Sequence, residues 1–173
     1  TTVLAYLDYG SEFSKRSYDL LTTEVMNYLP GEIAIAYRHY PRVFGEVDND
    51  PMLDYAAHAS ECVAKYKGEE SFWYFSDLIY ENHNFDTPLT EIEVDAYAYR
   101  TGVSKDLYDK CMAEEELSYI IEDLVAEAGD YGTYGTPYFY ILTGGDQREI
   151  YGLPTSDYIK SLIDFSRTLN RLD

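Results

Sequence analysis

The sequence is poor in cysteine, in basic residues and in long apolar runs. Two cysteines occur among 173 residues, and their spacing fits neither a C-x-x-C motif nor a zinc site. No apolar run approaches the roughly 20 residues of a membrane-spanning helix, so we expect no membrane insertion. Thirteen Lys and Arg residues stand against 32 Asp and Glu residues, which gives a net charge of −19. This balance argues against nucleic acid and anionic membranes as partners, because both are bound through clustered basic side chains.

The acidic surplus has two interpretations. It gives a highly soluble surface, and it could also form an acidic face that recruits a basic partner. Apolar residues make up 46% of the chain, which is enough for the core of a single domain. The chain starts in an apolar segment without a Met, as expected of a processed or trimmed form.

The two cysteines, Cys62 and Cys111, are either two free core thiols or one disulfide. We favour the disulfide. A bridge that closes a loop of about 50 residues would stabilise the fold by roughly 4 kcal/mol in the chain-entropy model. It would also imply an oxidising compartment.

The first 40 residues predict a strand, a helix and a second strand. Residues 3–8 are almost wholly apolar, as in a strand buried on both faces. Residues 32–40 form a similar run, closed by a proline. The connection between them is long enough for a parallel crossover. Its apolar residues recur at helical spacing: Tyr18, Leu21, Val25 and Tyr28.

The rest of the chain predicts helices and then a hairpin. Residues 51–129 read as successive helices, with a capping box at Thr90 and Glu93 and a cap at Ser104. Two short strands follow at about 138–142 and 147–151, joined by a tight turn, and a final helix follows Pro154. We therefore predict one α/β domain, residues 1–173, of the thioredoxin-like type. Its core comprises 1–50 and 130–173, and 51–129 is a helical insertion.

Four separated stretches carry a family resemblance. YLDYGSEFSKR resembles a strand followed by C-P-Y-C-K, and YRHYP resembles a second strand ending in R-H-F-P. AAHASECVAKYKGEESFWYFSDLIYEN resembles the first helices of a helical lid, and GTYGTPYFYI resembles the V-x-G-T-P-T-F-F segment of a cis-proline loop. At compatible spacing, these stretches make the chain similar to DsbA-like proteins of the thioredoxin fold.

The resemblance implies a site at the strand–helix junction. Ser11 occupies the position of the family's attacking cysteine, and Ser14 that of the resolving one. The groove for an extended substrate would be formed by Glu12, Phe13, Thr136 and Pro137, with the Thr136–Pro137 bond cis. The family also favours an extracytoplasmic location. A hydroxyl cannot form a disulfide, so this pair cannot perform thiol–disulfide exchange.

Three hypotheses follow. In the first, the chain is a non-redox domain that binds a peptide or protein partner and needs no cofactor. In the second, it is a DsbA-type oxidoreductase seen as a Cys-to-Ser variant. In the third, it resembles the kappa-class glutathione transferases and the related 2-hydroxychromene-2-carboxylate isomerases, in which a serine aligned with Ser11 binds glutathione. Ala5 stands where the family often has a buried acid and Glu12 where it usually has Pro, which favours natural loss of redox chemistry.

The remaining candidate residues are assigned structural roles. Asp8 is expected to cap or orient the junction rather than act as a base on Ser11. His39 lies in a predicted strand and is expected to satisfy a core or interface hydrogen bond. His58 and His83 are far apart in the sequence, and the histidines show no metal-ligand spacing. The oligomeric state does not follow from the sequence.

Overall fold

The computed structural model describes residues 1–41, 50–114, 117–133 and 135–170. The described strands form one sheet of order β2-β1-β3-β4: β1 Thr2–Leu7, β2 Ala34–His39, β3 Tyr138–Thr143 and β4 Asp146–Tyr151. β1 is parallel to β2 and antiparallel to β3, and β3 and β4 form an antiparallel hairpin. The hairpin turns at Gly144 and Gly145, as predicted. Gly144 takes a positive φ of 59°, which a glycine adopts without strain.

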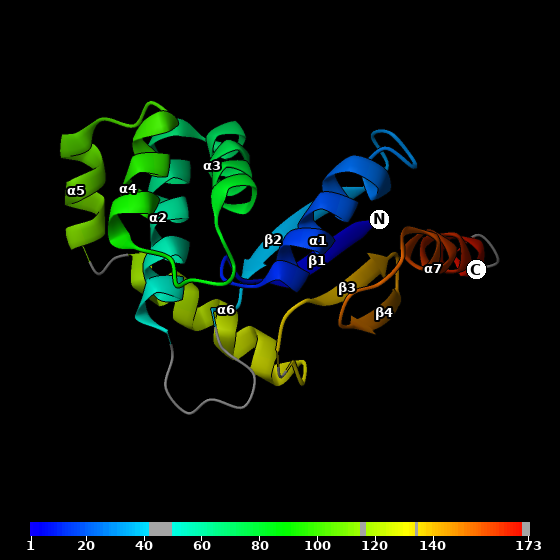
Figure 1. The fold of residues 1–173 in the computed structure, drawn as a ribbon. Coiled ribbons are helices and arrows are strands. Elements are labelled where there is room, and N and C mark those ends of the chain that lie inside the picture. Colours follow the sequence, from blue (N-terminus) through cyan, green and yellow to red (C-terminus); the bar gives the residue numbers. More distant parts are fainter. Residues whose placement is uncertain (42–49, 115–116, 134, 171–173) are drawn as a thin grey trace.

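Helices connect and cover the sheet (Figure 1). α1 Glu12–Leu20 continues into a π-helical turn, η1 Leu21–Val25, and leads from β1 to β2. Between β2 and β3 the described helices are α2 Pro51–Lys67, α3 Glu69–Asn82, α4 Glu91–Arg100, α5 Lys105–Ala113 and α6 Ser118–Asp130. α7 Ser156–Leu169 follows β4. The described strands and the helical segments thus appear in the predicted order.

The boundaries differ from the predictions in small ways. Each predicted strand lies within about two residues of the observed one. The last helix of the predicted segment 51–129 begins at Ser118, and residues 115–116 of that segment lie outside the described residues. Residues 42–49 of the predicted core segment also lie outside them. No helix in the described part of the chain is long and apolar enough to cross a membrane.

The central strand β1 is buried on both faces, which explains its continuous apolar sequence. Val3, Ala5 and Leu7 belong to the main core, together with residues of α1, η1 and α7. Tyr6 points to the opposite face, where it packs with Tyr138, Tyr140 and Ala128 of α6. β1 thus ends inside the protein, and the residues that follow it are held on a rigid support.

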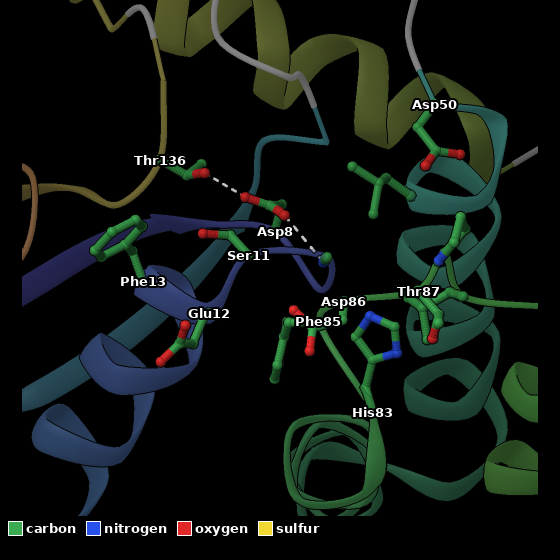
Figure 2. A pocket seen from close by; sticks show the side chains of 14 residues that line it. Asp8, Ser11, Glu12, Phe13, Asp50, His83, Phe85, Asp86, Thr87 and Thr136 are labelled. Carbon is green, nitrogen blue, oxygen red and sulfur yellow. Dashed lines mark hydrogen bonds between the residues drawn. The ribbon is translucent and has the colours of Figure 1, made fainter.

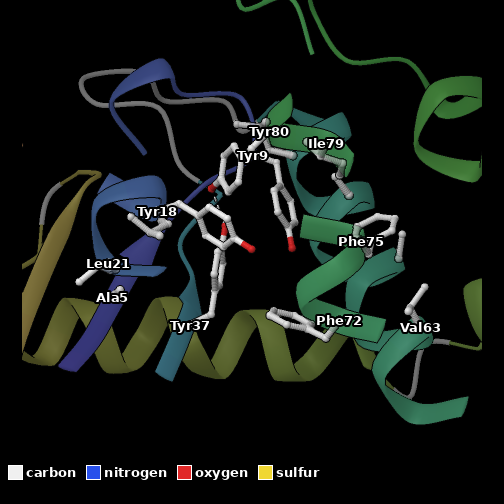
Figure 3. Packing of buried hydrophobic residues seen from close by; sticks show 14 of the residues in the cluster. Ala5, Tyr9, Tyr18, Leu21, Tyr37, Val63, Phe72, Phe75, Ile79 and Tyr80 are labelled. Carbon is white, nitrogen blue, oxygen red and sulfur yellow. Dashed lines mark hydrogen bonds between the residues drawn. The ribbon is translucent and has the colours of Figure 1, made fainter. Parts of the chain in front are cut away.

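Buried tyrosines join the sheet to the inserted helices (Figure 3). Tyr9 follows β1, and its ring stacks on Tyr37 of β2 at 5.6 Å between centroids. The Tyr9 hydroxyl hydrogen-bonds to Ser76 of α3 at 2.8 Å, and the Tyr37 and Tyr80 hydroxyls are 2.8 Å apart. Because these buried hydroxyls have partners, their hydrogen bonds offset the cost of taking them out of water. The aromatic cluster fixes α3 against the junction between β1 and α1.

Candidate functional site

The site begins where β1 ends and α1 starts. Ser11 has extended backbone angles and caps α1, because its Oγ accepts a hydrogen bond from the Ser14 amide at 3.2 Å. Ser14 lies one helical turn further and is fully buried. Its Oγ accepts from the Asp8 amide at 3.2 Å and donates to Asp8 Oδ2 at 3.3 Å. The two serines therefore serve the junction as hydrogen-bonding groups.

Asp8 is the centre of this hydrogen-bond network. Its side chain is buried, and Oδ1 accepts from the Gly10 amide at 2.9 Å. Oδ2 accepts from Thr136 Oγ1 as well as from Ser14. Burial raises the pKa of the Asp8 carboxyl, and the hydrogen bonds from Thr136, Gly10 and Ser14 oppose that rise. Asp8 thus orients the junction, as expected.

Thr136 and Pro137 approach the junction from the other half of the chain. The peptide bond between them, expected to be cis, is cis in the structure. The Pro137 carbonyl accepts a hydrogen bond from the Gly152 amide at 2.9 Å, which ties the loop to the end of β4. Figure 2 shows the Thr136 side chain directed at Asp8. The fold therefore brings residues 8–14 and 136–137 together.

One cavity of about 550 Å³ opens at this meeting point. Of the predicted site residues, Ser11, Glu12, Phe13 and Thr136 line it. Ser14 and Pro137 are buried beside it and are not among its lining residues. Phe13 is 56% exposed, which is unusual for a phenylalanine and places an apolar ring at the edge of the cavity.

The inserted helices form the opposite wall, which the sequence analysis did not identify. Asp50 and Leu53 come from the start of α2. The loop between α3 and α4 contributes His83, Phe85, Asp86, Thr87, Pro88 and Leu89. The segment H-N-F-D-T-P shows the composition of a loop, but nothing in it indicates that it faces residue 11. Burial lowers the pKa of His83, so its imidazole is neutral at neutral pH.

The cavity is acidic. Four carboxylates line it, from Asp8, Glu12, Asp50 and Asp86, and its described lining contains no Lys or Arg. An adjoining cavity of about 340 Å³ shares Glu12 and Asp86 and adds Glu81 and Lys15. The Lys15 ammonium is paired with Asp19 at 2.6 Å, so its charge is already compensated within α1. The field at the mouth of the site is therefore negative.

The cysteines form a disulfide, and this prediction is confirmed. Cys62 of α2 and Cys111 of α5 are bridged and fully buried. The bridge joins two inserted helices and is absent from the described lining of the site. The His58 ring and the two sulfurs lie within 4.8 Å of one another, a grouping that histidine spacing alone did not reveal. Bridged sulfurs are not the thiolate ligands that a metal would need.

His39 has the structural role that was predicted. It is buried in β2, and its Nε2 lies 3.0 Å from Ser60 Oγ and 3.2 Å from Glu61 Oε1 on α2. The ring also packs against Tyr9 and Tyr37. His39 therefore fastens the sheet to α2.

The site contains hydroxyls, carboxylates and a neutral imidazole but no thiol. The Asp8 carboxylate engages the hydroxyls of Ser14 and Thr136, whereas Ser11 Oγ acts as a helix cap. The two hydroxyls of the S-x-x-S segment cannot exchange electrons with a disulfide, since they cannot form one themselves. What the arrangement offers is a preformed, partly apolar cleft with a negative field.

Comparison with known proteins identifies the fold. No family model matches the chain, and no curated protein matches it. Solved structures do match. BdbD from Bacillus subtilis, oxidised, gives a TM-score of 0.78 at 19% identity over 95% of this chain and 86% of that chain. DsbA2 from Pseudomonas aeruginosa gives 0.74 at 21% identity over 95% and 87%.

A periplasmic thioredoxin-like protein from Salmonella enterica serovar Typhimurium also matches. It gives a TM-score of 0.70 at 17% identity over 95% of this chain and 83% of that chain. The chain therefore has a thioredoxin-like fold whose solved neighbours include DsbA-type proteins. At these identities the likeness establishes the fold, and the activity must be argued from the site.

Proposed function

We propose that this chain is a thioredoxin-fold binding domain that holds an extended polypeptide at the cleft and performs no thiol–disulfide exchange at residues 11–14. The observation that carries the proposal is the pair of hydroxyls at the junction opposite the cis-proline loop. Ser11 and Ser14 stand where that chemistry would need sulfur, and both hydroxyls are engaged in hydrogen bonds of the junction.

The cleft has the properties of a binding site. Its volume of about 550 Å³ lies within the range of about 300–1,000 Å³ that is usual for ligand pockets. Its walls come from the start of α1, the start of α2 and the loop between α3 and α4. The exposed Phe13 ring offers apolar contact area that the fold itself does not use.

A redox assay with a matched variant tests the first half of the proposal. The unaltered chain should reduce insulin and oxidise a dithiol peptide only at the background rate. An active thioredoxin serves as the positive comparison, and Ser11→Cys/Ser14→Cys shows how much exchange the two thiols restore in this acidic cleft. A second variant, Cys62→Ala/Cys111→Ala, tests whether the buried disulfide contributes. Turnover by the unaltered chain that disappears in Cys62→Ala/Cys111→Ala would show that the protein is an oxidoreductase through its buried disulfide and would contradict a purely binding function.

A binding assay tests the second half. End-capped, cysteine-free peptides of extended conformation should bind the unaltered chain in a fluorescence anisotropy titration. Phe13→Ala should weaken binding about tenfold, the cost of losing one aromatic contact at the centre of an interface. Tyr158→Ala is the matched control, because Tyr158 is 50% exposed on α7. Equal weakening by both variants would refute a site at the cleft.

A dithiol oxidoreductase whose two cysteines are replaced by serine in this chain is the second candidate. It is favoured by the structural neighbours, among them a protein from Silicibacter pomeroyi DSS-3 described as a thioredoxin-like oxidoreductase. The encoding gene decides this point, since cysteine codons at positions 11 and 14 would establish it.

Glutathione binding of the kappa type is less well supported. The four carboxylates of the cavity repel an anionic tripeptide. Calorimetry with glutathione should show no binding, and binding that is lost in Ser11→Ala would reverse this conclusion.

We also propose an extracytoplasmic location. The buried Cys62–Cys111 disulfide supports an oxidising compartment, and one structural neighbour is described as periplasmic. Extracting the protein from its native cells under alkylating conditions would show whether the bridge exists there.

A further inference from the structure

We propose that the cleft selects an extended peptide whose central side chain is Arg or Lys, with the cationic group seated in the cavity between α1 and the α3–α4 loop. This inference rests on the proposed binding function and specifies the chemistry of its partner.

The charge of the cavity is the first argument. Its carboxylates come from four separate elements: Asp8 after β1, Glu12 in the first turn of α1, Asp50 at the cap of α2, and Asp86 in the α3–α4 loop. Figure 2 shows Glu12 on α1 and Asp86 on the α3–α4 loop, with Asp8 beside Thr136. A side chain entering between these walls would meet negative charge on both sides. Charge complementarity therefore requires a cation.

The described surroundings contain little that could neutralise this field. Lys15 is the basic residue of the adjoining cavity, and it is paired with Asp19. His83 is neutral because burial lowers its pKa. The carboxylates of the cleft therefore lack a cationic partner among the described residues that line the two cavities.

The apolar lining is the second argument. Arg and Lys carry a long aliphatic stem behind the charge, and such stems pack along apolar surfaces. Four apolar side chains share the cavity with the carboxylates: Phe13, Leu53, Phe85 and Leu89. The rings of Phe13 and Phe85 also offer a cation–π contact to a guanidinium. A mixed wall of this kind fits an Arg side chain better than a small hydrated cation.

The existing hydrogen bonds argue against a metal ion as the occupant. Both Asp8 oxygens already accept hydrogen bonds from the protein, and Asp50 Oδ1 caps α2 through the Met52 amide at 2.8 Å. These carboxylates supply a field and cannot all turn inward as ligands without breaking the junction and a helix cap.

The test compares three end-capped heptapeptide pools in which Ala, Val and Thr are randomised at the flanking positions. The central residue is Arg, its neutral isostere citrulline, or Glu. Anisotropy titrations at low salt should show the Arg pool binding about tenfold more tightly than the citrulline pool, the size expected for one charge-assisted contact. The Glu pool should bind most weakly. Added salt should reduce the difference in affinity between the Arg and citrulline pools.

Matched variants locate the effect. Glu12→Gln/Asp86→Asn removes two charges from the cleft. It should bring the ratio of the affinities for the Arg and citrulline pools close to one. Glu122→Gln/Asp157→Asn removes two charges from exposed positions on α6 and α7 and should leave the ratio unchanged. Circular dichroism of all variants confirms that the fold is retained.

The outcomes separate this inference from the function on which it rests. Equal binding of the Arg and citrulline pools, with Phe13→Ala weakening both, would overturn the cationic preference and leave peptide binding in place. An equal fall of the Arg-to-citrulline affinity ratio in both charge variants would show that the preference comes from the net charge of the protein. That result would also overturn the inference. Absence of binding by all three pools would overturn the proposed function together with it.

Discussion

Removal of the disulfide between Cys62 and Cys111 should lower the free energy of unfolding of the protein. The bridge joins α2 to α5 across a sequence separation of 49 residues. In the unfolded chain it closes a loop of about 50 residues, which restricts the denatured ensemble. Reducing it should therefore destabilise the protein mainly by releasing that loop.

The loop length sets the magnitude. The chain-entropy relation gives a loss of about 14 cal/mol/K for this loop, or about 4 kcal/mol at 25 °C. Cys62→Ala/Cys111→Ala should cost slightly more, because both sulfurs are fully buried and their removal leaves small voids. With a urea m-value of about 2 kcal/mol/M, the midpoint should fall by about 2 M.

Urea unfolding followed by circular dichroism measures this effect in three samples: the oxidised protein, the reduced protein, and the double alanine variant. Intact mass after alkylation verifies that the bridge is broken in the reduced sample. The reduced protein and the variant should unfold at similar urea concentrations, well below the oxidised protein. A loss under about 1 kcal/mol in fully reduced protein would refute the loop-closure reasoning.

The same urea titration tests three further predictions. Because burial raises the pKa of Asp8, the folded state holds that proton more tightly than the unfolded chain. Stability should thus rise as pH falls through the range above the ordinary Asp pKa, and Asp8→Asn, which does not titrate, should flatten this rise. A flat profile in the unaltered protein would contradict it. Tyr80→Phe should cost about 2 kcal/mol, because the Asp8 carbonyl and the Tyr37 hydroxyl lose a buried partner; Tyr158→Phe, at an exposed site, is the control. Thr90→Ala removes the capping box of α4 and should cost about 1 kcal/mol.

Much of the fold follows from local patterns in the sequence. The strand after Thr1 is continuous in apolar residues because both faces of β1 are covered. The capping box at Thr90 and Glu93 and the cap at Ser104 form as predicted, since capping depends on a few neighbouring residues. Gly68, with a φ of 83°, separates α2 from α3 where the helical pattern pauses. The sheet order β2-β1-β3-β4 has no such local signature, and the sequence analysis predicted only a thioredoxin-like type from the order of the elements.

The residues of the candidate site also fall into two groups: those that the sequence predicts and those placed by tertiary packing. Residues 11–13 and Thr136 were predicted because they belong to stretches that resemble one family and occur at compatible spacing. Asp50, His83 and Asp86 belong to the other wall of the cavity and were missed. Their position depends on how the inserted helices pack on the sheet through Tyr9, Tyr37 and Tyr80. A single sequence does not show that packing, because it joins residues more than 40 positions apart.

The electrostatics of the cleft bear on its chemistry independently of the serines. An attacking thiol needs surroundings that favour a thiolate, and nearby positive charge or a helix N-terminus provides them. Here Asp8, Glu12, Asp50 and Asp86 line the cavity at the start of α1. These carboxylates would raise the pKa of a cysteine placed at residue 11 and so disfavour its thiolate. Replacing two cysteines by serine would not create this field. The acidic lining therefore supports a cleft adapted to hold a cationic group rather than to activate sulfur.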